Sequence, residues 1–235
     1  MNLILFSEAD LCAEGRITLQ DDRFTQIKRI HRSSTGDRVR VGEIGGLIGS
    51  GCIRSIDSAA VVIDYELDQR PPEKLPLRII LALPRPKMMR RIVRCVAEFG
   101  VSELIVINSF KVEKSFWQSP ALNPDNIRQY LLAGLQQSKD TVLPVVSFRP
   151  RFKPFVEDEL PALVAGRRAL LAHPGIGGPC PQGLNQAATL AIGPEGGFSD
   201  YEVDKFLATG FEGVHLGSRI LRVENALTAL VAKLY

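Results

Sequence analysis

The sequence predicts an α/β protein made of two domains. Short runs with strand character, separated by glycine-rich turns, fill residues 1–70 and indicate a small β-barrel with one helix. A segment with three prolines, residues 71–76, resists helix and central strand alike and is expected to be a linker. In residues 77–235, apolar runs alternate with helical patterns, which is typical of an α/β domain with a mostly parallel sheet.

Length and composition limit the class of protein. The chain has 235 residues, 45% hydrophobic residues and a net charge of +3, which is ordinary for a globular protein with a full core. No run of 18 or more apolar residues occurs, so no membrane span is expected. Acidic residues follow the short apolar start, so a signal peptide is not expected either. Four scattered cysteines and three histidines, with no Cys-x-x-Cys pair, argue against a metal site and favour reduced thiols in the cytoplasm.

The first domain is predicted from local patterns. Residues 21–31 have helical spacing, with Phe24, Ile27 and Ile30 on one face. The expected strands are 38–41, 47–56 and 59–67. No cluster of titratable side chains is expected in this domain. Two interpretations stay equally open, a packing module and an RNA-binding accessory domain, and the second rests on a group of cations in the sequence. These cations are Lys28, Arg29, Arg32, Arg38 and Arg40.

The second domain alternates strands and helices. Strands are expected at 77–83, 101–107, 142–148, 169–172, 190–192 and 214–216, and helices at 86–99, 126–137, 200–208 and 224–234. Gly100 is expected just after the end of the first helix, and Ser199 with Glu202 has the spacing of a capping box at the start of the third.

The helix after Pro86 carries a basic face. Its cations fall at i, i+3, i+4 and i+7, and a further arginine precedes them. They are Arg85, Lys87, Arg90, Arg91 and Arg94. No acidic residue lies within 85–94, so these cations repel one another and favour a partner with phosphates. The alternative is an ordinary solvated face.

Two glycine turns mark the candidate site. Residues 193–197 follow one buried strand, and residues 216–222 follow the next, so both loops are expected at the carboxyl edge of the sheet, where ligands bind. Neither loop has the pattern of a Walker A or dinucleotide-binding motif. The apolar side chains of Ile220 and Leu221 are suited to wall a flat uncharged group. His173 and His215 have no paired nucleophile and are interpreted as structural.

Residues 192–199 with Glu202, followed by residues 216–222 with Glu224, resemble the RsmE family. This family consists of 16S ribosomal RNA (uridine-N3) methyltransferases of the SPOUT superfamily. The resemblance spans the whole chain and implies a PUA-like N-terminal barrel and a C-terminal domain with a deep trefoil knot. It further implies S-adenosyl-L-methionine as cofactor, a homodimer, and 16S ribosomal RNA or the small ribosomal subunit as substrate.

The resemblance also assigns roles to residues. Arg222 is expected to stabilise the uridine anion, and Glu195 or Glu224 to accept the proton or to orient Arg222, although an ordinary ion pair with either glutamate is the alternative for Arg222. Lys28, Arg29 and Arg32 and the basic helix are expected to contact RNA. The expected cofactor-binding residues are Leu171, Gly193, Pro194, Glu195, Gly196, Gly197, Leu216, Gly217, Ser218, Ile220 and Leu221.

The chain departs from the family pattern at several positions. Val223 and Asn225 stand where the family often has threonines, so the hydroxyl groups of that pattern are missing here. Asp140 stands where the family has an arginine, and RNA contacts are expected to differ in detail. Three other functions compete: a SPOUT enzyme acting on another RNA position, a non-catalytic RNA-binding protein, and a dinucleotide-dependent dehydrogenase. The last is disfavoured because the dinucleotide fingerprint is missing.

Overall fold

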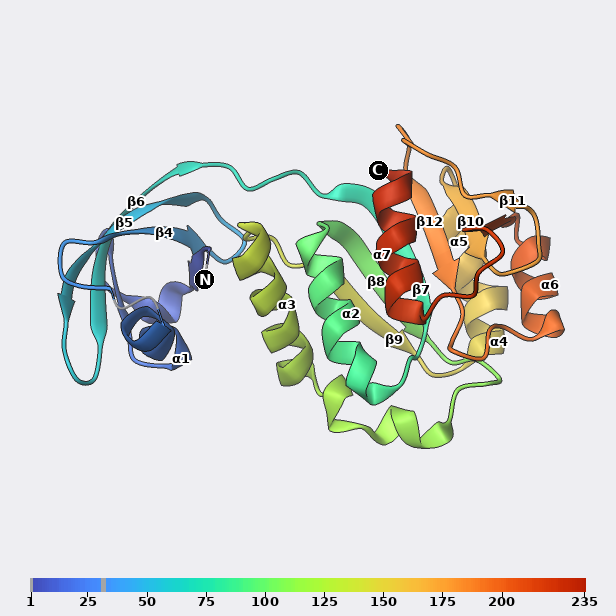
Figure 1. Cartoon of the computed structure of the whole chain (residues 1–235), viewed down its shortest axis with the longest axis horizontal. Helices are drawn as coiled ribbons and strands as arrows, with labels where there is room; N and C mark the ends of the chain where they lie inside the picture. The colour runs from blue at the N-terminus through green and yellow to red at the C-terminus, as the bar shows by residue number, and fades with distance from the viewer. Residues whose placement is uncertain (1, 31–32) are drawn as a thin grey trace. The chain divides into compact units, whose positions relative to one another are not determined.

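The computed structural model describes residues 2–30 and 33–235 and divides into two compact units (Figure 1). The first unit comprises Met1–Glu73 and Leu132–Leu143, and the second comprises Lys74–Leu131 and Pro144–Tyr235. The linker expected at 71–76 stays a prediction, although a strand begins inside it at Leu75. Among the described residues, no helix is both long and apolar enough to cross a membrane.

The first unit is a curled six-stranded sheet. Its hydrogen-bonded order is β1 (Ile4–Phe6), β4 (Arg38–Glu43), β5 (Ile48–Ile56), β6 (Val61–Gln69), β3 (Arg16–Leu19) and β2 (Leu11–Ala13). The pair β1–β4 is parallel and the others are antiparallel. The sequence predicted β4, β5 and β6. It did not predict the first three strands, because runs of three or four residues are too short to show alternation.

Helical turns and a small apolar core complete this unit. The predicted helix is α1 (Asp22–Thr25) followed by a π-helical turn, η2 (Gln26–Ile30), and a 3-10 turn, η1 (Glu8–Asp10), joins β1 to β2. Phe24 and Ile27 pack with the inward side chains of the strands, as the helical spacing predicted, and the side chain of Ile30 lies outside the described part of the chain. The strands approach closely at Gly49 in β5, where an added Cβ would lie 1.8 Å from the Glu66 carbonyl oxygen.

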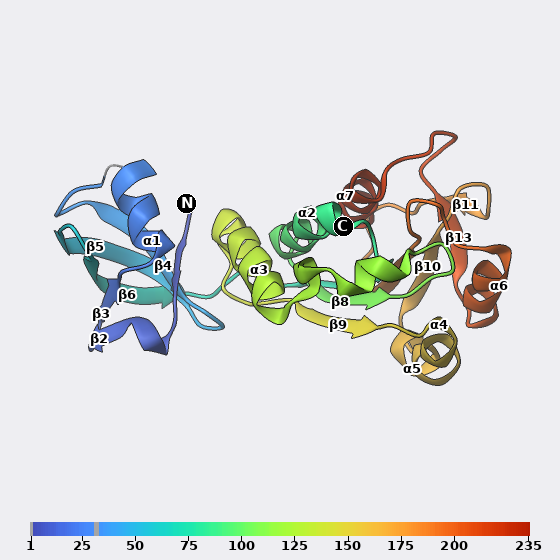
Figure 2. The same cartoon turned by 90° about the horizontal axis from the view of Figure 1, so that it is seen from below.

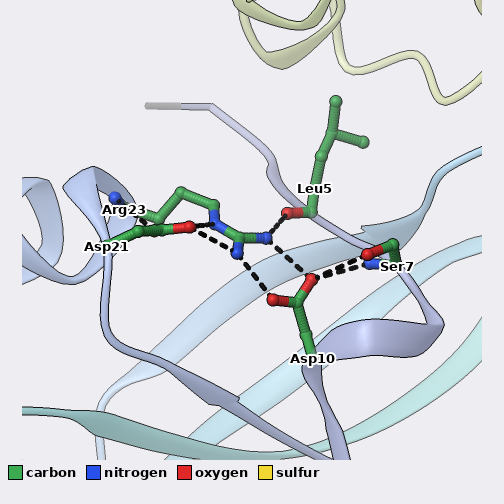
Figure 3. Close-up of polar contacts among 5 residues, drawn as sticks. All are labelled: Leu5, Ser7, Asp10, Asp21 and Arg23. Carbon is green, nitrogen blue, oxygen red and sulfur yellow. Dashed lines mark hydrogen bonds and ion pairs between the residues drawn. The ribbon is translucent and has the colours of Figure 1, made fainter.

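The first unit contains a cluster of charges around Arg23, so the expectation of no clustered titratable side chains was wrong (Figure 3). The Arg23 guanidinium donates to both carboxylate oxygens of Asp10 at 2.6 and 2.9 Å, and to both oxygens of Asp21. It also donates to the Leu5 carbonyl oxygen at 2.8 Å. The Ser7 backbone N–H donates to Asp10 at 2.8 Å. The cluster therefore ties β1, η1 and the start of α1 together.

We expect this cluster to make the first unit sensitive to acid. Burial raises the pKa of Asp10, but hydrogen bonds from Arg23 and Ser7 outweigh it, so the pKa lies below its ordinary value of 3.8. Hydrogen bonds from Arg23 likewise lower the pKa of Asp21. A lowered folded-state pKa contributes stability above the unfolded-state pKa, and this stability is lost as the pH falls through the folded-state pKa. Hydrogen exchange of β1 and α1 in the full chain should therefore accelerate below about pH 4 more in the wild type than in Arg23→Met; equal acceleration would contradict the prediction.

Residues 132–143 belong to the first unit through hydrogen bonds to the turn between β4 and β5. The Thr141 hydroxyl donates to the Gly46 carbonyl oxygen at 2.6 Å, and the Gly45 N–H donates to the Thr141 carbonyl oxygen at 2.8 Å. Asp140 is 3% exposed and accepts a hydrogen bond from the Val142 N–H. At this departure from the family pattern, the side chain thus stabilises a buried turn.

The second unit is built on a seven-stranded sheet in which every pair is parallel, as predicted. The order is β11 (Gly178–Pro179), β13 (Glu212–His215), β10 (Arg168–Ala172), β12 (Ala188–Ile192), β7 (Leu75–Ala82), β8 (Val101–Ile107) and β9 (Val145–Arg149). Every residue of the central strand β12 is buried, which explains its almost continuous apolar sequence.

Helices cover the sheet of the second unit (Figure 2). On one side lie α2 (Pro86–Glu98) and α7 (Val223–Leu234), and on the other lie α4 (Phe152–Pro154) and α5 (Leu160–Val164), joined by the π-helical turn η5 (Phe155–Glu159). This unit also contains α6 (Asp200–Ala208) and the 3-10 turns η3 (Lys114–Gln118) and η4 (Pro120–Leu122). Helix α3 (Pro124–Ser138) begins in this unit, and its residues from Leu132 onward belong to the first unit. The predicted end of α2 at Gly100 is confirmed by its φ of 68°. The trefoil knot stays a prediction.

Candidate active site

The loops that follow β10, β12 and β13 surround a pocket of about 530 Å³ in the second unit. These strands are neighbours in a parallel sheet, so their carboxyl ends lie at one edge, where ligands bind in such sheets. The predicted residues that line the pocket are Gly193, Pro194, Glu195, Gly196, Gly197, Leu216, Gly217, Ile220, Leu221 and Arg222. The two glycine loops are therefore brought together, as expected from their positions after buried strands.

The first loop is a tight turn that requires glycine. The Gly197 N–H donates to the Pro194 carbonyl oxygen at 2.8 Å, and Gly197 has a φ of +71°, which glycine adopts readily. At Gly193, an added Cβ would lie 3.0 Å from the Phe198 nitrogen. The predicted capping box follows directly: the Ser199 N–H donates to the Glu202 carboxylate at 2.9 Å. The start of α6 thus fixes the loop on one side.

The Glu202 carboxylate also holds a distant loop. It is 2% exposed and accepts hydrogen bonds from the Ser109 hydroxyl at 3.1 Å and from the Phe110 N–H at 2.7 Å. The loop after β8 is therefore fixed beside the first glycine loop. The capping pattern predicted the local bonds of Glu202 but gave no indication of this second partner.

The loop after β8 adds two residues that the sequence did not indicate. Lys111 lines the pocket, and its ammonium donates to the Gly196 carbonyl oxygen at 2.8 Å. Phe110 is 83% exposed although its backbone is held by the buried Glu202. A cation and an exposed aromatic ring are thus presented next to the glycine loop, which suits contact with a nucleic acid.

The second loop presents apolar and cationic side chains. Gly217 has a φ of +104°, and its N–H donates to His215 Nδ1 at 3.1 Å. Ile220 is 80% exposed and Leu221 is 41% exposed, and both line the pocket. Arg222 is exposed at the N-cap of α7 and, among the described residues, makes no ion pair with a carboxylate. Its guanidinium is therefore accessible to a ligand.

The two glutamates expected near Arg222 differ in position. Glu195 lines the pocket, is exposed, and accepts a hydrogen bond from the Arg85 N–H at 3.1 Å. This bond places the start of α2 beside the pocket. Glu224 lies in the first turn of α7, outside the pocket wall. Ser218 and the buried Leu171 lie outside the wall, and their contacts with the cofactor stay predictions.

Both histidines of the second unit line the pocket, although the sequence favoured a structural role. His173 follows β10, and its Nδ1 lies 2.7 Å from the Pro174 carbonyl oxygen. Of the two departures from the threonine pattern, Val223 is 5% exposed and lines the pocket, whereas Asn225 is exposed. The wall is therefore apolar where a hydroxyl was expected from the family pattern.

The predicted basic face of α2 has the expected geometry. Lys87, Arg90 and Arg91 are exposed and Arg94 is half-buried. The opposite face packs into the core through Met89, Ile92, Val93, Val96 and Ala97. In the first unit, Lys28 donates to the Asp57 carbonyl oxygen and lies over the Phe24 ring. Arg32 and the side chain of Arg29 lie outside the described part of the chain.

In residues 2–30 and 33–235, His, Cys, Asp and Glu side chains form no group of three or more suited to a metal ion. The possible ligand contacts of the pocket are therefore backbone groups, apolar side chains, cations, carboxylates and imidazoles.

Residues 71–235 match the family model of the RNA methyltransferase domain. Over 242 aligned residues, the chain is 29% identical to the ribosomal RNA small subunit methyltransferase E of Treponema pallidum, covering 99% of this chain and 90% of the relative.

Solved structures show the same fold. A probable rRNA-methyltransferase from Porphyromonas gingivalis superposes with a TM-score of 0.70 at 25% identity, covering 97% of this chain and 94% of that one. A ribosomal RNA small subunit methyltransferase E from Neisseria gonorrhoeae, solved bound to S-adenosyl methionine, has a TM-score of 0.74 at 17% identity, covering 98% and 95%. The second likeness concerns the fold alone.

Proposed function

Because this chain belongs to the RsmE family of RNA methyltransferases, we propose that it transfers a methyl group from S-adenosyl-L-methionine to N3 of a uridine in 16S ribosomal RNA. Membership of this family identifies the chain as an S-adenosylmethionine-dependent ribosomal RNA methyltransferase. The proposal that N3 of a uridine is methylated rests on the pocket, in which two glycine loops meet beside an accessible arginine, Arg222.

The glycine loops suit the cofactor. The pocket volume of about 530 Å³ lies within the range of about 300–1,000 Å³ common for small-molecule sites. Gly193, Gly196 and Leu216 would present backbone groups to the polar ends of S-adenosylmethionine, and Ile220 with Leu221 would cover its flat adenine. When bound, the cofactor supplies an electrophilic methyl carbon, and the protein supplies orientation and electrostatics.

Arg222 suits the substrate. Uridine N3 is nucleophilic only after it loses its proton, and the resulting negative charge spreads onto O2 and O4. A guanidinium donates through a planar fork and holds such an anion well, but it does not act as a base. Since Arg222 has no carboxylate partner among the described side chains, its charge is available for this role.

The basic face of α2 suits the RNA backbone. The hydrogen bond between Glu195 and the Arg85 N–H places the start of this face beside the pocket. Its exposed cations are Lys87, Arg90 and Arg91. Phosphates bound along this face would lead the strand toward the pocket.

We expect the substitution Arg90→Glu to weaken RNA binding about tenfold and to lower the slope of log Kd against log salt by about one. S-adenosylmethionine affinity should not change, because the side chain is outside the pocket wall. Fluorescence anisotropy over a salt series with a ribosomal RNA fragment checks this. Lys153→Glu is the matched control, since Lys153 is an exposed cation on α4, across the sheet from α2. Equal losses in both variants would indicate a general charge effect.

The proposal also covers the role of the first unit, the oligomeric state of the enzyme and its location. We propose that the first unit is a PUA-like accessory domain for RNA, which the exposed Arg38 and Arg40 on β4 support. Lys28, Arg29 and Arg32 remain proposed RNA contacts on the same unit. We further propose that the enzyme acts as a homodimer in the cytoplasm, as the family resemblance implies.

Mass spectrometry of ribosomal RNA nucleosides tests the proposed function. Cells that lack this protein should lose 3-methyluridine from 16S ribosomal RNA and regain it when the gene is restored. Loss of a different modified nucleoside would assign the enzyme to another RNA position. No change in any nucleoside, together with no S-adenosylmethionine binding by calorimetry, would favour a non-catalytic RNA-binding protein.

A further inference from the structure

The proposed reaction needs a group that accepts the N3 proton, and the two glutamates considered from the sequence are poorly placed for it. Glu224 lies outside the pocket wall. Glu195 lines the pocket but is exposed, and its carboxylate accepts the Arg85 N–H. A guanidinium does not act as a base, so Arg222 is not the proton acceptor. The proton acceptor must therefore be sought among the other pocket residues.

His173 presents a lone pair to the pocket. Its Nδ1 lies 2.7 Å from the Pro174 carbonyl oxygen, and a carbonyl oxygen only accepts hydrogen bonds, so Nδ1 carries the hydrogen. In the neutral ring, Nε2 is then the unprotonated nitrogen. This Nε2 lies 3.9 Å from the position of a Cβ added to Gly197, so it faces the first glycine loop. The His173 N–H donates to the Val214 carbonyl oxygen at 3.0 Å, which fixes the backbone.

His215 has the opposite arrangement. Its Nδ1 accepts the Gly217 N–H at 3.1 Å, so Nδ1 is unprotonated and the hydrogen of the neutral ring is on Nε2. His215 therefore offers a donor, whereas His173 offers an acceptor. Of the two imidazoles in the pocket wall, only His173 is ready to receive a proton.

The chemistry favours an imidazole over a carboxylate. An imidazole has an ordinary pKa of about 6.5 and a carboxylate about 4, so the imidazole is the stronger base near neutral pH. Asp200, the remaining carboxylate of the pocket, is exposed in the first turn of α6. The other charged groups of the wall are Lys111, Glu195, Arg219 and Arg222.

We propose that His173 Nε2 accepts the N3 proton of the target uridine, an inference that rests on the proposed function. The N3–H bond breaks and its electron pair stays on N3, where Arg222 stabilises the charge. N3 then bonds to the methyl carbon as the carbon–sulfur bond breaks, and S-adenosylhomocysteine leaves as a neutral thioether. The imidazolium finally returns its proton to water.

The variant His173→Gln tests this role. A glutamine oxygen can accept a hydrogen bond near the position of Nε2 but cannot take the proton. We expect kcat to fall by about 10²–10⁴-fold, the S-adenosylmethionine Kd measured by calorimetry to stay within about twofold, and the acidic limb of the pH–rate profile to disappear. In His173→Ala, added imidazole should restore part of the activity, which a structural role would not produce.

Two results would overturn the inference. One is a kcat and a pH–rate profile in His173→Gln that match the wild type. The other is a raised S-adenosylmethionine Kd with no imidazole rescue in His173→Ala, which would make His173 a cofactor contact. If the wild type itself produces no 3-methyluridine, the proposed function fails instead, so the two failures are distinguishable.

Discussion

Arg222→Ala is expected to lower kcat for uridine methylation by about 10²–10³-fold, because the negative charge of the uridine anion would lose its fork of donors. S-adenosylmethionine should bind with unchanged affinity, since the backbone groups of the glycine loops remain in place. Single-turnover transfer of a labelled methyl group measures the first quantity, and calorimetry measures the second.

Two further variants separate charge from structure at this position. Arg222 is the N-cap residue of α7 but uses no side-chain capping bond, so its truncation should not fray the helix. Arg222→Met keeps an apolar stem and should be as inactive as Arg222→Ala. Arg222→Lys keeps the charge without the planar fork and should recover only part of the rate. Near-normal turnover in Arg222→Ala would remove Arg222 from the mechanism.

Local signals predicted the features that depend on few neighbouring residues. The turns at Gly193 and Gly217, the capping box at Ser199 and the basic face of α2 were all readable from the sequence, because each is encoded within one or two helical turns or a single loop. The parallel sheet was also predictable, since buried strands alternate with helices. The pocket then followed from the rule that such loops share one edge of the sheet.

Features assembled from distant segments were not predictable. Lys111 meets Gly196 only because of the order of the strands, and Glu202 joins Ser109 across a separation of 93 residues. The tautomer of His173 follows from the contact of its Nδ1 with the Pro174 carbonyl oxygen, which the sequence does not reveal. The helical segment between residues 152 and 164 was missed because Pro154, Pro161 and a π-helical turn interrupt the regular helical period.

The charge cluster of the first unit was likewise not predicted from the sequence. Among the substitutions proposed for this protein, those that remove the cluster should lower its stability the most. Arg23→Ala is expected to lower the free energy of unfolding of this unit by about 2–4 kcal/mol, near the lower end of values for broken buried pairs. The side chains of Arg23 and Asp10 are 21% and 13% exposed, so solvent screens the pair only partly. Hydrogen exchange of the full chain, followed in β1 and α1, measures the change.

Arg54→Ala is the matched control for this prediction. Arg54 pairs with Asp64 at 3.2 Å in the same unit, but its side chain is 57% exposed, and exposed pairs contribute only about 0–1 kcal/mol. A double-mutant cycle between Arg23 and Asp10 then isolates the pair, because truncating Arg23 leaves the carboxylate of Asp10 without its cation. If Arg23→Ala lowers the free energy of unfolding no more than Arg54→Ala does, solvent compensates for the lost interactions, and the cluster does not hold β1 against α1.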